Sequence, residues 1–91
     1  MAYPYSNLYG DISVTVAFNS VIIPMDVSAG LPVLDQLADI LIRHQITKPN
    51  TINANGQIAY KLQKGAADLD NGKTFAQQGV HDGDALTIAT V

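Results

Sequence analysis

Few residues of this chain are of the types that carry out chemistry. The sequence has two histidines, no cysteine and eight acidic residues, all of them aspartates. His81 lies beside Asp82 and close to Asp84, a spacing that a metal site or an acid–base pair could use. The same segment contains Gly83, and Asp and Gly are the residues that supply the backbone geometry of a solvated turn. We interpret the segment as a turn, without a catalytic or metal-binding role.

The remaining candidates for a reactive or ligand-binding site have simpler explanations. Residues 68–72 resemble the start of a calcium loop, but Gly79 stands where the closing bidentate Glu would be. The glycines at 72, 79 and 83 form no phosphate loop, since no strand-to-helix junction with Lys-Ser/Thr follows them. His44 is expected to end a helix and to face the negative end of its dipole. We therefore expect no enzymatic activity, no cofactor and no metal.

Composition narrows the class of protein further. Ninety-one residues form one small domain, and 47% hydrophobic residues with only 14% charged residues exclude a charged, disordered chain. The net charge of −3 gives no basic surface for nucleic acid or anionic lipid. No apolar run approaches the roughly 20 residues that span a bilayer. We expect a cytoplasmic protein with no nucleic-acid partner and no direct membrane insertion.

The first third of the chain predicts a hairpin. Apolar and small polar residues alternate over residues 12–18, which is typical of a strand with one buried face. Asn19 and Ser20 make a short polar break, and residues 21–27 continue with β-rich sequence. Because Pro24 has no N–H to donate to a ladder, the second strand is expected at a sheet edge.

The apolar period then changes to that of a helix over residues 32–45. The expected buried stripe consists of Val33, Leu34, Leu37, Ile40, Leu41 and His44. Ile42 lies off this stripe and is expected to be exposed. A loop over residues 47–56 follows, in which Ile52 could belong to a short strand that pairs back across a turn at residues 55–56. A strand is expected over 58–62, turns over 64–74 and 79–83, and a last strand at 86–89. This order of elements predicts a two-layer α+β fold, with one helix stripe buried on a sheet.

The C-terminal third resembles a known family. The segments 69–75 (LDNGKTF), 79–80 (GV) and 82–88 (DGDALTI) are similar to the end of a ubiquitin-like β-grasp domain, which has a turn, a short helical piece and a final strand. The resemblance implies a mixed four- to five-stranded sheet packed on one α-helix. It also implies a ubiquitin-like domain over residues 11–91, with residues 1–10 as a flexible N-terminal arm. The ending looks most like the EsaB/YukD group of small bacterial proteins, and it resembles the ubiquitin-like domain of EccD-type proteins. Both groups belong to type VII secretion.

The resemblance implies a non-enzymatic, unconjugated protein-interaction module, an accessory of a bacterial type VII secretion system. The alternative is a ubiquitin-like modifier or sulfur carrier, activated by an adenylating enzyme through a flexible Gly-Gly end. Residues 87–91 (TIATV) lie directly on the predicted last strand and contain no Gly-Gly. Conjugation would therefore need a longer precursor.

The binding surface has several candidates. Transferring ubiquitin's apolar recognition patch by this resemblance gives Lys61, Gln63, Thr87 and Ala89, which form a largely polar surface. We therefore expect ubiquitin receptors to bind poorly and another surface to carry the interaction. The N-terminal tyrosines could dock on the domain or on a partner, or belong to a loose arm; the edge strand could pair with another strand. The candidate interaction residues are Tyr3, Tyr5, Tyr9, Val21, Ile23, Ile42, Lys61 and Gln63. Low charge density leaves the oligomeric state open.

Overall fold

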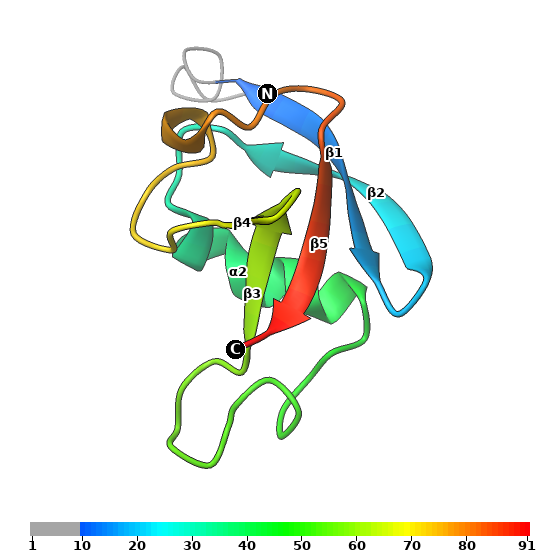
Figure 1. The fold of residues 1–91 in the computed structure, drawn as a ribbon, viewed down its shortest axis with the longest axis vertical. Helices are drawn as coiled ribbons and strands as arrows, with labels where there is room; N and C mark the ends of the chain where they lie inside the picture. Colours follow the sequence, from blue (N-terminus) through cyan, green and yellow to red (C-terminus); the bar gives the residue numbers. More distant parts are fainter. Residues whose placement is uncertain (1–9) are drawn as a thin grey trace, which may run out of the picture.

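The structure, a computed structural model, describes residues 10–91 and contains one mixed sheet with one α-helix on it (Figure 1). The elements are β1 (Asp11–Phe18), β2 (Val21–Ser28), α2 (Val33–Arg43), β3 (Tyr60–Lys64), β4 (Ala67–Asp68), the short 3-10 helix η1 (Ala76–Gln78) and β5 (Ala85–Thr90). The strand order is β2-β1-β5-β3-β4. The central pair β1–β5 is parallel, and the other neighbours are antiparallel. The predicted α+β class and its mixed sheet on one helix are confirmed.

The predicted hairpin and its edge position are also confirmed. β1 and β2 pair along their full lengths, from Asp11 with Ser28 to Phe18 with Val21. Asn19 and Ser20 connect them with φ of 50° and 69°, and two consecutive positive φ angles are what a type I′ turn requires. That turn has the twist of the strands it joins, so the hairpin needs no longer loop.

The helix departs from the expected pattern at one residue. Val33, Leu37, Ile40 and Leu41 are buried, whereas Leu34 is 48% exposed. At about 100° per residue, Leu34 lies just outside the arc of the helix that the four buried residues span. The expected stripe was therefore too wide, and the prediction that Leu34 is buried is wrong.

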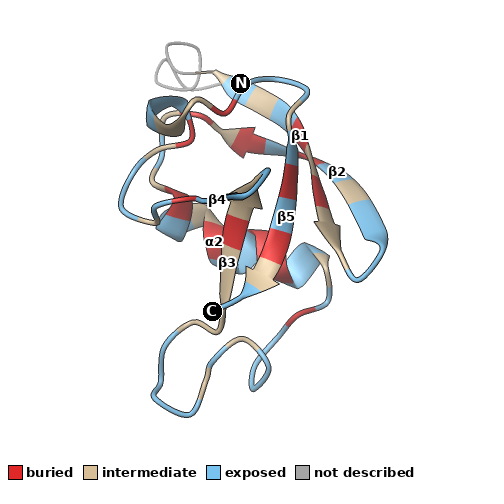
Figure 2. Ribbon diagram, viewed as in Figure 1, coloured by how far each residue is buried: buried red, intermediate tan, exposed pale blue. Residues whose placement is uncertain are grey.

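The core lies between α2 and the inner face of the sheet (Figure 2). Its most enclosed side chains are Phe75, Leu37, Ile40, Leu41, Leu62, Leu86, Val14, Val16 and Val33. The strand residues among them alternate with half-buried or exposed ones, as the period-two pattern predicted. The helix and the four longer strands therefore share one apolar layer.

The segment between α2 and β5 contains two features that the sequence only partly indicated. Ile52 and Ile58 form an isolated antiparallel bridge across the 53–57 turn, and the two-residue strand β4 lies within a segment that was expected to consist of turns. η1 ends at Gly79, whose φ of 74° stops the helical piece. This short helical piece is the one that the resemblance implied.

Candidate functional site

β2 forms one edge of the sheet, and alternate residues of it turn their backbone groups to the open side. The N–H of Thr15 donates to the carbonyl of Asp84 at 3.1 Å, on the β5 side of β1. Thr15 faces Pro24, so this is a non-hydrogen-bonded pair, and Pro24 also turns its backbone groups away from β1. By the two-residue alternation of a strand, Ile22 and Asp26 do the same. The open edge offers the N–H and C=O groups of Ile22 and Asp26, and only the C=O group of Pro24.

Ser28 is the next residue whose backbone groups face outward, and these groups are already hydrogen-bonded to a side chain. The N–H of Ser28 donates to Oε1 of Gln36 at 2.8 Å, and Nε2 of Gln36 donates to the carbonyl of Ser28 at 2.9 Å. The carboxamide of Gln36 thus makes the two bonds that a residue of a neighbouring strand would make. Its Nε2 also lies 3.3 Å from the carbonyl of Leu31. Within residues 10–91, the backbone groups that face outward at 22, 24 and 26 have no hydrogen-bond partner.

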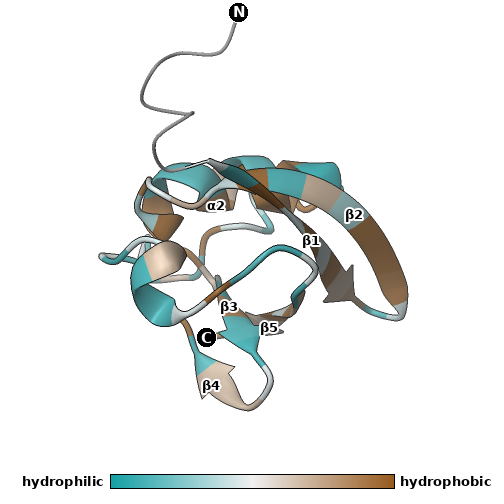
Figure 3. Cartoon of the chain, turned by 90° about the horizontal axis from the view of Figure 1, so that it is seen from above, coloured by the Kyte–Doolittle hydropathy of each residue, from teal (hydrophilic) through white to brown (hydrophobic). Residues whose placement is uncertain are grey.

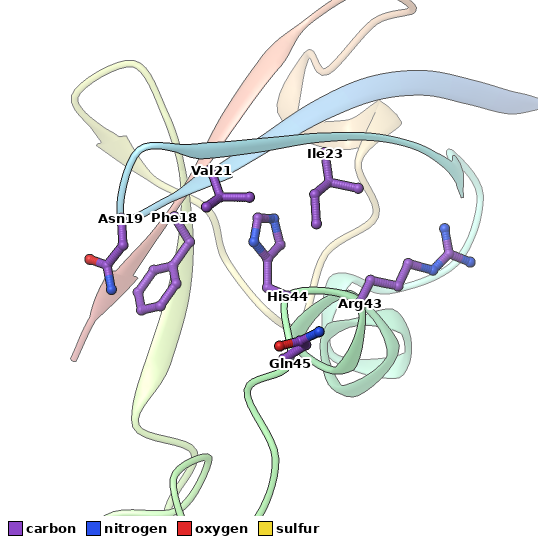
Figure 4. Close-up of a pocket in the computed structure, with 7 residues that line it drawn as sticks. All are labelled: Phe18, Asn19, Val21, Ile23, Arg43, His44 and Gln45. Carbon is purple, nitrogen blue, oxygen red and sulfur yellow. The ribbon is translucent and has the colours of Figure 1, made fainter.

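A hollow of about 360 Å³ lies between the hairpin end of β2 and the C-terminal end of α2 (Figure 4). Its lining consists of Phe18, Asn19, Val21, Ile23, Arg43, His44 and Gln45. Val21 is 53% exposed and the neighbouring Ile22 is 65% exposed. Figure 3 shows this hairpin end as a continuous hydrophobic stretch of β2. The hollow therefore has one apolar side, formed by Phe18, Val21 and Ile23, which lies next to the open strand edge, and a polar side at the end of the helix.

His44 joins the end of the helix to the sheet. It occupies the C-cap position of α2, as expected, and its ring turns towards β1. Nε2 of His44 lies 2.8 Å from the carbonyl of Val16, a contact in which the ring nitrogen donates. The ring also meets Phe18 edge-on, with the ring centres 6.3 Å apart. These contacts position the helix end beside β2 and so form one wall of the hollow.

The outer face of β3 and β5 is polar. Lys61 is paired with Ala89 and Gln63 with Thr87, so the four residues that the resemblance selected are two cross-strand pairs. Nζ of Lys61 lies 2.9 Å from Oδ2 of Asp68, and Nε2 of Gln63 donates to Oδ1 of Asp68 at 2.8 Å. These bonds, that of Gln63 first, lower the pKa of Asp68 below its usual value. Both long side chains thus have partners within the domain, and a role for them in binding stays a prediction.

The aspartates beside His81 hold a turn together. The N–H of His81 donates to Oδ2 of Asp84 at 2.8 Å, and Oδ1 of Asp82 accepts from the N–H of Ser13 at 2.7 Å. The first of these bonds, together with Lys64 at 3.2 Å, lowers the pKa of Asp84. Within the part of the chain that the structure describes, no group of three potential ligands is placed to hold a metal ion. The presence of these carboxylates is therefore explained by the backbone hydrogen bonds that they accept.

Ile42 is 57% exposed, as its place off the helical stripe predicted. It borders a second, apolar hollow of about 310 Å³. The lining of that hollow is Ala38, Leu41, Ile42, Ile46, Thr47, Lys48, Thr51, Ile52 and Ile58. The tyrosines at 3, 5 and 9 lie outside the described residues, so their expected docking stays a prediction.

The structure brings together one set of predicted residues and adds others. Val21 and Ile23 line the same hollow, but Ile42 borders a different one and Lys61 and Gln63 lie on the outer face. Sequence reasoning missed Gln36, Arg43 and the aromatic ring of Phe18. A glutamine on the polar side of a helix carries no signal that it will reach a strand edge. Only packing of α2 on the sheet reveals it.

Several solved structures share this arrangement at low sequence identity. A ubiquitin of Caldiarchaeum subterraneum matches with a TM-score of 0.66 and 16% identity, over 90% of this chain and 95% of the ubiquitin. The fold is the ubiquitin-like β-grasp. The ubiquitin-like domain of the Mycobacterium tuberculosis type VII secretion system protein EccD1 matches this β-grasp with a TM-score of 0.65 and 17% identity, over 88% of this chain and 98% of that domain.

A third β-grasp match lies within a larger chain. A chain in the structure of protomer 1 of the ESX-3 core complex matches with a TM-score of 0.69 and 22% identity, over 89% of this chain but only 16% of that chain. No family model matches the sequence, and no curated protein does either. No helix of residues 10–91 is long and apolar enough to cross a bilayer. Membership of the EsaB/YukD group stays a prediction.

Proposed function

We propose that this chain is a non-enzymatic, unconjugated ubiquitin-like module that binds a protein partner by strand addition at β2. In this role the partner contributes one extended segment to the sheet, and backbone hydrogen bonds supply much of the affinity. The supporting observation is the open edge beside the hollow, where exposed apolar side chains and unpaired backbone groups lie together. An exposed apolar edge is otherwise a liability that proteins usually shield.

The cellular setting of the proposal is the cytoplasmic side of a bacterial type VII secretion system. Two considerations support it: the resemblance of the sequence ending to proteins of such systems, and the likeness of the fold to the EccD1 domain and to part of an ESX-3 core complex. The polar outer face of β3 and β5 favours β2 over a ubiquitin-type recognition surface, because an apolar anchor is lacking there.

The proposal is tested by capturing partners from the host with the tagged protein, in parallel under native and denaturing washes. We expect secretion-machinery proteins, identified by mass spectrometry, under native conditions only. The capture is repeated with Ile22→Pro, which removes an outward-facing donor, and with Leu34→Ala as a control for lost apolar surface away from β2. Absence of any native partner would refute the proposal. Adducts that survive denaturation would instead identify a modifier or carrier.

A further inference from the structure

We infer that residues 22–26 pair with an extended partner segment whose side chains are apolar at alternate positions, in a register set by Pro24 and Gln36. This inference rests on the proposed function and specifies the chemistry of the partner. It follows from which backbone groups of β2 are free, which are already bonded and where the hollow lies.

The hydrogen-bonding groups of β2 define the register. Ile22 and Asp26 each present a donor and an acceptor, whereas Pro24 presents an acceptor alone. A partner strand that is shifted towards Ser28 meets groups that Gln36 already bonds. A strand that is shifted the other way reaches Ser20, which lies in the turn with a φ of 69°. The free edge is thus closed at both ends, and one register uses all of its free groups.

Side-chain alternation determines which partner residues must be apolar. Val21 and Ile23 point to the helix side of the sheet and line the hollow. Directly opposed residues of paired strands share a face, so the partner residues opposite Val21 and Ile23 also enter this side. There they meet Phe18 and the ring of His44, next to the hollow of about 360 Å³ (Figure 4). A lysine or arginine side chain would lose hydration there without an ion partner, and Arg43 of the lining is already paired with Asp39 at 3.0 Å. Aliphatic or aromatic residues are therefore favoured.

A second copy of this chain is a poorer occupant of the edge. A symmetric pairing that sets Ile22 opposite Asp26 brings Pro24 against Pro24, so that two donors are missing at the centre. If the two copies are shifted by one hydrogen-bonded pair in one direction, Ile22 lies opposite Ser28, whose backbone groups Gln36 already bonds. A shift in the other direction sets Asp26 against Ser20 in the turn. Every symmetric register therefore leaves backbone N–H or C=O groups of β2 without a partner, whereas a strand of different sequence can bond them.

The test uses a capped synthetic peptide with valine and threonine alternating and a lysine at each end, titrated into the 15N-labelled protein to millimolar concentration. We expect shifts of the amide resonances of Ile22 and Asp26, with the Ser28 amide little changed. Ile22→Pro should weaken binding about two- to twelvefold, which corresponds to one net hydrogen bond. Pro24 shows that this strand accommodates proline at an outward position. Leu34→Ala should bind the peptide like the wild type.

Two N-methylated peptides provide a matched chemical control. Methylation of the amide that donates to the Pro24 carbonyl should weaken binding, and methylation of the next amide, which points away from β2, should not. Absence of shifts at Ile22 and Asp26, or equal effects of the two methylations, would overturn the inference. So would self-association in sedimentation that Ile22→Pro abolishes. If capture from the host still succeeds in these cases, the proposed function stands and only this partner chemistry fails.

Discussion

Replacement of Gln36 by alanine tests whether a side chain closes one end of the β2 edge. The wild-type carboxamide makes two hydrogen bonds to Ser28, at 2.8 and 2.9 Å, in a part-buried setting. Each bond is expected to contribute about 0.5–1.5 kcal/mol net to the free energy of unfolding. The higher helix propensity of alanine offsets a few tenths of a kcal/mol of the loss. The free energy of unfolding should therefore fall by about 0.7–2.7 kcal/mol, which lowers the melting temperature by roughly 3–20 °C for a domain of this size.

Urea denaturation followed by circular dichroism measures this loss, with an unchanged m-value showing that the unfolded states are comparable. The matched control is Gln57→Ala, an exposed glutamine outside any helix or strand, for which we expect a change within about 0.5 kcal/mol. The Ser28 amide should exchange with solvent faster in Gln36→Ala, and it should join the amides that the probe peptide shifts. Unchanged stability together with unchanged Ser28 exchange would show that Gln36 does not close the edge.

The remaining predictions concern the packing and electrostatics of the domain. Leu37→Ala should cost about 2–5 kcal/mol in urea denaturation, and Leu34→Ala less than about 1 kcal/mol, because only the first side chain is buried; equal costs would mean that the helix is rotated. Because the folded-state pKa of Asp84 lies below its ordinary 3.8, its contribution is present above pH 3.8 and is lost as the pH falls through the depressed value. The melting temperature should thus fall less steeply below pH 3.8 in Asp84→Asn than in wild type, and parallel curves would contradict this. The amides of Val14 and Val16 should be among the slowest to exchange, because β1 lies between β2 and β5; rapid exchange there would contradict a central β1.

Much of the fold could be predicted from local pattern. The alternation over residues 12–18 and at Leu86 and Ile88 reflects a strand with one buried face, and both strands lie where expected. Pro24 predicted an edge strand because a missing N–H is tolerated only where no neighbour needs it. Leu34 could not be placed by pattern, since a helix of eleven residues allows two widths of apolar stripe. The two residues of β4 are too few to show any period.

The sequence by itself determined the four longer strands, the helix, the edge position of β2 and the absence of thiol chemistry. These follow from side-chain period, from the missing N–H of proline and from composition, all of which act over a few residues. Only the tertiary structure decided which β2 groups remain free, because this depends on the register with β1 and on the side chain of Gln36. It also decided that His44 and Arg43 stand beside Val21 and Ile23. Residues some twenty positions apart meet only when the helix packs across the sheet, and no local pattern encodes that distance.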